Sequence, residues 1–383
     1  MKLLGWILVF LVSASPAWAA KKITVQQLKD LLISEQQVRK SDADVAFELK
    51  QVELSEELTA STIGNMLGTL PGPLTTEQIT ILEARSAVLA PPLADLPSTP
   101  PLDAAAQKAL LDKAVDYAEK TYAHLPHLTA TKDTARYQDD TQPPIAGANK
   151  DLSASWEDPN QGTANKFIHF IAFTETPVES RNGAQIASRG KDKTPWGANG
   201  QIVLYGQGPV LSAIVQEAQA VGKLAWLRWE TVNGKQTAVF SFAVDKKKSH
   251  YAVDYCCFPD TDRVGGTNSV VANTTQIYSD WKNVKATVPY HGEVFVEPET
   301  GIVVRLVVKA DFKPSDAVHQ EDTRTDYSIV TVGATALTLP VRTIVNTEVV
   351  PVGDDSSSKF SIRHTLFTSQ YRNYQLADAT APK

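Results

Sequence analysis

The segment from Tyr290 to Leu306 constrains the fold more than any other part of the chain. It holds two runs in which apolar residues alternate with polar or small ones, separated by Pro298-Glu299-Thr300-Gly301. Alternation with a period of two indicates strands that bury one face of a sheet. Proline presets φ for a turn, and glycine can adopt the positive φ that closes it. The segment therefore predicts a β-hairpin.

The same alternation recurs after Leu128, which predicts a meandering antiparallel sheet. Asn233-Gly234 stands between two alternating runs and is a strong hairpin signal. A short helix is expected over 208–220, and the polar segments 138–165 and 182–200 are expected to be long loops. The candidate strands are Leu128–Tyr137, Lys166–Thr174, Gln201–Tyr205, Leu224–Val232, Gln236–Val244, His250–Phe258, Gly292–Val296, Ile302–Phe312, Thr323–Val330, Leu337–Val350 and Lys359–Tyr371.

The N-terminal part reads as helical. Four runs with apolar residues at helical spacing are each preceded or opened by a potential capping residue, Thr24, Asp42, Ser55 or Thr75. We therefore expect residues 22–90 to form a small bundle of four helices. Residues 91–102 are rich in proline and predict an extended linker with few contacts across it. The rest, 103–383, is expected to be one long helix capped by Asp103 and then the sheet. The fold class is therefore α+β.

The N-terminus has the layout of a secretory signal peptide over 1–19. A basic start precedes the apolar run from Leu3 to Val12, and Ala17-Trp18-Ala19 is a small-x-small cleavage site. The apolar run is shorter than the roughly 20 residues that a membrane-spanning helix needs. We expect a periplasmic or secreted protein, with an uncleaved N-terminal anchor as the alternative.

Composition and motifs exclude several functions. The net charge of −6 lacks the basic footprint of a nucleic-acid-binding protein. The motifs of hydrolase nucleophiles, zinc proteases and phosphate-binding loops are absent from the sequence. We therefore predict no catalytic residue, no metal and no cofactor. An exported hydrolase that uses His250, Asp254 and His291 stays open as an alternative.

Three small groups of residues allow two interpretations each. Cys256 and Cys257 are adjacent, and two buried thiols are favoured over a strained vicinal disulfide, although the redox state stays open. His124 and His127 favour the end of a helix over a metal site. The Lys246-Lys247-Lys248 run favours a solvated turn, with peripheral contact to an anionic membrane as the alternative.

Aromatic residues on consecutive strands suggest a binding site. Strand alternation predicts that Trp226 and Trp229 point to opposite faces, so large apolar side chains would line both faces of the sheet. A curved sheet of this kind is typical of an apolar ligand groove. The predicted ligand-binding residues are Leu211, Trp226, Trp229, Phe240, Phe242 and Tyr251.

The order of elements resembles a known fold. A long helix runs into a strand through Tyr122-Ala123-His124-Leu125-Pro126-His127-Leu128, and successive hairpins follow, including Gly292–Leu306 with its Glu-Pro-Glu-Thr-Gly turn. This arrangement resembles the half-open β-barrel of the bacterial lipoprotein-carrier and envelope-stress-sensor superfamily. The resemblance implies a concave sheet, covered by helices, that accepts acyl chains.

Nearly all of the mature chain also resembles uncharacterised secreted bacterial proteins. The motifs that carry this resemblance are Gly208-Pro209-Val210-Leu211, Trp226-Leu227-Arg228-Trp229-Glu230, Lys248-Ser249-His250-Tyr251 and the Gly292 hairpin.

The expected function is thus non-enzymatic. The half-barrel groove would bind a lipid or lipoprotein acyl chain, or a partner protein of the envelope. A structural or regulatory interaction protein, with the helical bundle as its working surface, is the further alternative. A filled core in place of a cavity would favour that alternative.

Overall fold

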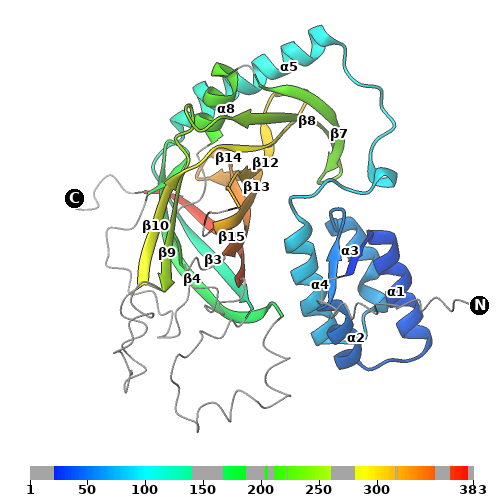
Figure 1. Ribbon diagram of the computed structural model, residues 1–383. Coiled ribbons are helices and arrows are strands. Elements are labelled where there is room, and N and C mark those ends of the chain that lie inside the picture. The colour runs from blue at the N-terminus through cyan, green and yellow to red at the C-terminus, as the bar shows by residue number, and fades with distance from the viewer. Residues whose placement is uncertain are drawn as a thin grey trace, which may run out of the picture.

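The computed structural model describes residues 21–139, 167–186, 203–205, 211–221, 223–259, 281–314, 316, 318–349 and 363–377. The signal peptide predicted over 1–19 lies outside these residues. In the described part, a helical unit formed by residues 21–90 lies beside a large curved antiparallel sheet (Figure 1). The α+β class is confirmed.

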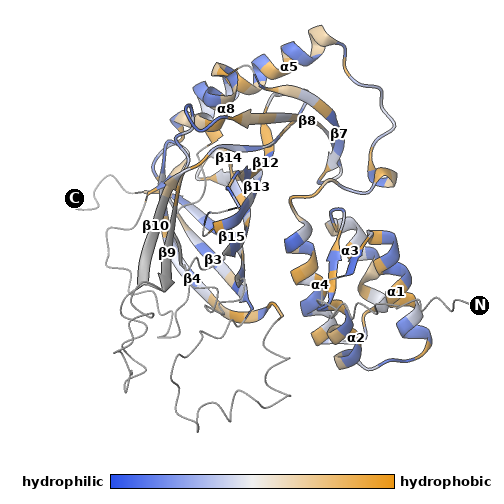
Figure 2. Cartoon of the chain, viewed as in Figure 1, coloured by the Kyte–Doolittle hydropathy of each residue, from blue (hydrophilic) through white to orange (hydrophobic). Residues whose placement is uncertain are grey.

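The helical unit contains four α-helices and a short parallel ribbon. Its elements are β1 (Lys21–Ile23), α1 (Val25–Gln37), α2 (Asp42–Leu49), β2 (Val52–Leu54), α3 (Ala60–Met66), a 3₁₀ turn at Leu67–Thr69 and α4 (Pro73–Ser86). Thr24 caps α1 as predicted, and its hydroxyl accepts a hydrogen bond from the Gln27 N–H at 3.1 Å. The helices carry both apolar and polar residues (Figure 2), and α4 contributes to two apolar clusters. Apolar side chains of the helices form the core of the unit, which includes Leu28, Leu32, Leu49 and Ile79.

The predicted start of the third helix is wrong. α3 begins at Ala60, with Thr59 as its cap, and not at Ser55. Residues 55–59 instead form an irregular segment, and the side chain of Glu57 in this segment is 5% exposed. Glu57 is thus not part of a helix, and its side chain contacts the sheet.

The main sheet has ten strands in the order β5-β4-β3-β15-β14-β13-β12-β11-β8-β7. Their bounds are β3 (Leu128–Gln138), β4 (His169–Arg181), β5 (Ala184–Ile186), β7 (Ala225–Val232), β8 (Lys235–Val244), β11 (Tyr290–Val296), β12 (Val303–Ala310), β13 (Val318–Val332), β14 (Thr335–Val349) and β15 (Arg363–Leu376). A second sheet of three strands contains β6 (Val203–Tyr205), β9 (Ala252–Pro259) and β10 (Trp281–Thr287).

Both predicted hairpins are confirmed. Asn233 and Gly234 have φ of 50° and 76°, the positive values that a two-residue hairpin turn needs. Gly301 has φ of 77° in the turn between β11 and β12. At Gly292 the requirement for glycine is steric, because a Cβ there would lie 1.9 Å from the backbone oxygen of Val307 on the paired strand.

Helices cover one face of the main sheet, which we call the first face (Figure 1). They are α5 (Ala104–Asp116), the π-helical and 3₁₀ turns Tyr117–Thr121 and Tyr122–His124, and α8 (Leu211–Ala220). Asp103 caps α5 as predicted, and the helix expected over 208–220 is α8 within the described residues. The opposite face, which we call the second face, lies against the helical unit.

The segment 91–102 connects the helical unit to α5. A 3₁₀ turn spans Leu93–Asp95, and the backbone oxygen of Pro100 accepts a hydrogen bond from Trp229 Nε1 at 2.8 Å. The C-terminal end of this segment is therefore attached to β7. The domain boundary predicted at this segment stays a prediction.

Candidate functional site

The six residues predicted to line a groove come together on the first face. Five of them are at most 9% exposed, and Trp226 packs partly buried against the same apolar cluster. Leu211 comes from α8, Trp226 and Trp229 from β7, Phe240 and Phe242 from β8, and Tyr251 from the residue before β9. Residues that lie on four different segments thus share one apolar cluster.

The predicted orientation of the two tryptophans is wrong. Trp226 pairs with Phe240 and Arg228 pairs with Val239, so β7 has Leu227 as an extra residue between them. A β-bulge of this kind shifts the alternation of the strand by one residue. Trp229 therefore lies on the same face as Trp226, and their ring centroids are 5.0 Å apart. The argument that large apolar side chains must line both faces loses its basis.

The cluster on the first face is tightly packed. Trp226 and Phe240 meet edge to face with centroids 5.7 Å apart, and the Phe242 ring lies 6.0 Å from that of Tyr290. Helix α8 covers these rings with Ile214 and other side chains that are almost completely buried. Rings at these distances and angles are typical of a protein core.

The polar atoms of these aromatic residues are also bonded within the protein. Trp229 Nε1 donates to Pro100, as above. The Tyr251 hydroxyl donates to Glu321 Oε1 at 2.8 Å, and the Tyr290 hydroxyl donates to Glu217 Oε2 at 2.7 Å. Burial, followed by the neighbouring Glu321 carboxylate, raises the pKa of Tyr251, so its hydroxyl stays protonated and continues to donate. Buried aromatic residues with satisfied polar atoms act as core.

The second face carries a group of buried charges that we did not predict. We call it the ion cluster, and it consists of Glu57, Glu230, Arg305, Arg324 and Asp326, each at most 8% exposed. Four of these residues lie on strands of the sheet, and Glu57 belongs to the helical unit. The ion cluster therefore bridges the helical unit and the sheet.

The contacts in the ion cluster are short. Arg324 Nη1 lies 2.6 Å from Glu57 Oε1, and Arg324 Nε lies 3.1 Å from Asp326 Oδ1. Arg305 Nε lies 2.6 Å from the same Asp326 oxygen, and Arg305 Nη1 lies 3.5 Å from Glu230 Oε1. Arg324 also donates to the backbone oxygen of Ala87 at 3.3 Å. Each arginine thus binds at least two acceptors, which helps to offset the cost of burying charge.

The pKa values in the ion cluster reflect these contacts. Burial alone would raise the pKa of Asp326, but Arg324 and Arg305 outweigh it, so the pKa lies below its ordinary value. For Glu230 burial is the larger influence and raises the pKa, although Arg228 acts in the opposite direction. Asp326 is therefore the carboxylate that the two arginines hold firmly ionised.

Further contacts join the helical unit to the second face. Arg342 on β14 binds Glu83 on α4 through two hydrogen bonds of 2.7 and 2.6 Å. Val88 packs in a buried cluster with Val239 and Phe295 of the sheet. A second buried cluster joins α4 to the other end of the sheet through Ile81, Ala84, Ala87, Tyr137, Ile168, Ile344 and Leu366.

The histidines of the hydrolase alternative lie in separate pairs. His250 Nδ1 is 2.7 Å from Glu217 Oε1, and His291 Nδ1 is 2.8 Å from Asp311 Oδ1. The third residue, Asp254, has a side chain outside the described part of the chain, as do Cys256 and Cys257. Among the described residues, the ring nitrogens of His250 and His291 bond to these carboxylates and not to a serine or cysteine side chain.

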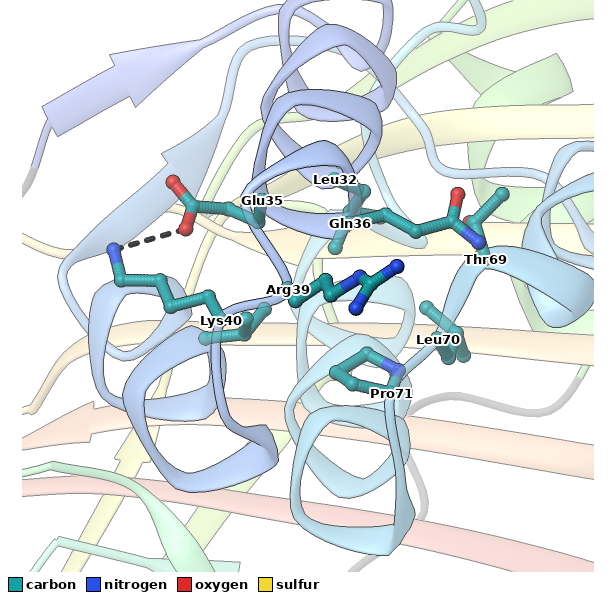
Figure 3. A pocket seen from close by; sticks show the side chains of 9 residues that line it. Leu32, Glu35, Gln36, Arg39, Lys40, Thr69, Leu70 and Pro71 are labelled. Carbon is teal, nitrogen blue, oxygen red and sulfur yellow. Dashed lines mark ion pairs between the residues drawn. The ribbon is translucent and has the colours of Figure 1, made fainter.

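A cavity of about 200 Å³ lies within the helical unit, at the C-terminal end of α1 (Figure 3). Leu32, Leu70 and Pro71 supply apolar lining, while Gln36 and Arg39 supply polar groups. The lining residues come from α1, the connection between α1 and α2, α2 and the segment before α4, so the cavity belongs to the helical unit alone. It lies apart from every residue that we predicted to bind a ligand.

The described residues contain no group of three or more His, Cys, Asp or Glu side chains arranged to hold a metal. The helices among them are all too short or too polar to span a membrane. The turn Lys246–Lys248 is exposed between β8 and β9, where membrane contact stays a prediction.

Comparison with protein-family models, curated proteins and solved structures gives no match. The resemblance to the lipoprotein-carrier superfamily therefore stays a prediction.

Two features of the site escaped the reading of the sequence. Arg305, Arg324 and Asp326 lie within predicted strands, but the sequence did not predict that their charges are buried. Their inward-facing charges could have been suspected, since each stands close to apolar residues within its strand. The sequence does not predict the left-handed conformation of Arg39, because no residue pattern there indicates that a helix ends in such a residue.

Proposed function

We propose that this protein is an exported, non-enzymatic binding protein whose ligand is a partner polypeptide, and that the helical unit holds the partner. The observation that carries the proposal is the packed core on the first face. The six residues expected to form a groove pack in one apolar cluster, and the polar atoms of Trp229 and Tyr251 are bonded to other parts of the protein, so they favour a scaffold over an acyl-chain site. Export is supported by the leader pattern over 1–19.

The attachment of the helical unit supports its role as the working part. A buried ion cluster and two apolar clusters hold it on the second face. Buried charges that pair across an interface fix the relative position of its two sides, since any other position leaves a charge unpaired. The sheet then presents the helical unit in one orientation, with the cavity at the end of α1 available to a partner.

Photo-crosslinking in the cells that make the protein tests this proposal. A photo-reactive amino acid replaces Val38, which is 71% exposed and precedes the lining residue Arg39 in the sequence. In a control it replaces Ile329, which is 64% exposed on β13. We expect a discrete crosslinked product with another protein from position 38 and none from position 329. Equal products from both positions, or none from position 38, would contradict the proposal.

A further inference from the structure

Arg39 has a backbone conformation that disfavours its side chain. It follows Val38, the C-cap residue of α1, and has φ of 54°. Its N–H donates to Gln36 O at 3.0 Å, and the Lys40 N–H donates to Glu35 O at 3.0 Å. This pair of bonds is a Schellman motif, in which the left-handed position is usually glycine. A left-handed residue with a side chain costs about 1–2 kcal/mol.

The strained residue faces the cavity. In Figure 3 the guanidinium of Arg39 extends toward Thr69 and Leu70, while Lys40 turns away toward Glu35. Backbone strain of this kind clusters at functional sites, where a side chain must be held in a particular place. Here the left-handed residue is one whose exposed side chain lines the cavity.

The charges around the cavity leave Arg39 unneutralised. Glu35 is the one acidic side chain that lines it, and Lys40 Nζ binds Glu35 Oε2 at 2.9 Å. Lys40 also pairs with Glu48. Among the described residues, Arg39 makes no side-chain hydrogen bond or ion pair. Within the part of the chain that the structure describes, Arg39 is therefore the lining cation without a protein partner. The lining also contains the amide of Gln36 and four apolar side chains, which we call the floor, Leu32, Val45, Leu70 and Pro71.

These groups define the chemistry of a ligand. A guanidinium binds a carboxylate through two parallel hydrogen bonds. An apolar cavity of about 150 Å³ can hold benzene, so a cavity of about 200 Å³ has room for a leucine-sized side chain. The last residue of a polypeptide can present a leucine-sized side chain next to a carboxylate. Binding of the C-terminal carboxylate is a recurring mode of peptide recognition.

We propose that this cavity binds the C-terminal residue of a partner polypeptide, with its apolar side chain on the floor and its carboxylate on Arg39. The inference rests on the proposed function, because it names the part of the partner that the helical unit holds. A free branched-chain carboxylic acid would share this chemistry. The two sources are distinguished by the test.

The test is a titration of the full mature chain, labelled at Leu and Val methyl groups, followed by NMR. The probes are N-acetyl-Ala-Ala-Leu with a free carboxylate, the same peptide as its C-terminal amide, and 4-methylpentanoate. We expect saturable shifts of the Leu32, Val45 and Leu70 methyls with the free-acid peptide. The amide is expected to bind at least tenfold more weakly, because it lacks the charge-assisted bonds. Equal affinity for the free-acid peptide and its amide, or no saturable shift, would overturn the proposal. Tighter binding of 4-methylpentanoate than of the peptide would also overturn it, because the site would then be assigned to a free acid.

Replacing Arg39 separates this role from a structural one. Arg39→Gly is expected to abolish binding of the free-acid peptide and to raise the thermal midpoint by a few degrees, because glycine adopts the left-handed conformation without strain. Arg181→Ala, at an exposed arginine in β4, is the matched control and should leave binding unchanged. Retained binding in Arg39→Gly, or a lower thermal midpoint, would contradict the inference.

The two proposals fail in different ways. A crosslinked partner at position 38 without any preference for a carboxylate would leave the proposed function standing and remove the ligand assignment. Absence of both the crosslink and the peptide shifts would remove both proposals.

Discussion

Replacing Arg324 with alanine is expected to destabilise the protein by about 3–5 kcal/mol, because removing one member of a buried ion pair leaves the others uncompensated. Arg324 is 6% exposed and binds Glu57, Asp326 and the backbone oxygen of Ala87. Among the described residues, its loss would leave the Glu57 carboxylate with the longer contact of 3.7 Å to Arg305 as its ion pair. Urea denaturation of wild type and variant measures the free energy of unfolding.

The control for Arg324→Ala is an exposed ion pair. Lys108 binds Asp112 at 2.6 Å on the surface of α5, with 74% of the Lys108 side chain exposed. Because solvent screens such a pair, Lys108→Ala should change the free energy of unfolding by less than about 0.5 kcal/mol. A similar small change for Arg324→Ala would mean that the ion cluster does not hold the helical unit on the second face.

Phe240→Ala is expected to cost about 3–5 kcal/mol, the usual range for deleting a large aromatic side chain from a packed core. Phe240 is 1% exposed, and its ring lies 5.7 Å from that of Trp226. The cavity left behind would lie beneath α8, where neighbouring side chains cannot all move to fill it. Thermal and urea unfolding monitored by tryptophan fluorescence would measure the loss, and Trp226 and Trp229 report on the site directly.

Phe173→Ala is the matched control for Phe240→Ala. Phe173 lies on β4 and is 59% exposed, so its loss should change stability by no more than about 0.5 kcal/mol. If Phe240 lined an open groove instead, Phe240→Ala would behave like this control. Such a result would restore the groove that the sequence predicted.

The sequence predicted local structure where a single short-range signal decides it. Thr24 and Asp103 cap helices at the expected positions, since a side-chain oxygen before an apolar helical run satisfies the first N–H groups. Asn233-Gly234 forms its hairpin because few residues other than Asn and Gly accept two successive positive φ values.

The errors arose where a long-range contact or one extra residue decides the structure. The bulge at Leu227 reverses the face of every later side chain in β7, and alternation alone does not reveal such a residue. Ser55 has the chemistry of a helix cap, but the segment after it is needed to bring Glu57 to Arg324, which is 267 residues away in the sequence.

The candidate site was harder to predict than the fold. The six apolar residues lie in one cluster, but a groove and a core are built from the same side chains. Only the ring contacts and the bonded hydroxyl groups distinguish the two. The role proposed for Arg39 depends on its positive φ, which arises where α1 ends. No residue pattern in the sequence predicts that angle.

Native mass spectrometry of the protein, purified from the cells that make it, tests most directly the claim that the first face holds a packed core. The account predicts the mass of the polypeptide alone, without any lipid retained under conditions gentle enough to preserve non-covalent complexes. A stoichiometric acyl-chain ligand that survives purification, and is lost in Phe242→Glu, would contradict it.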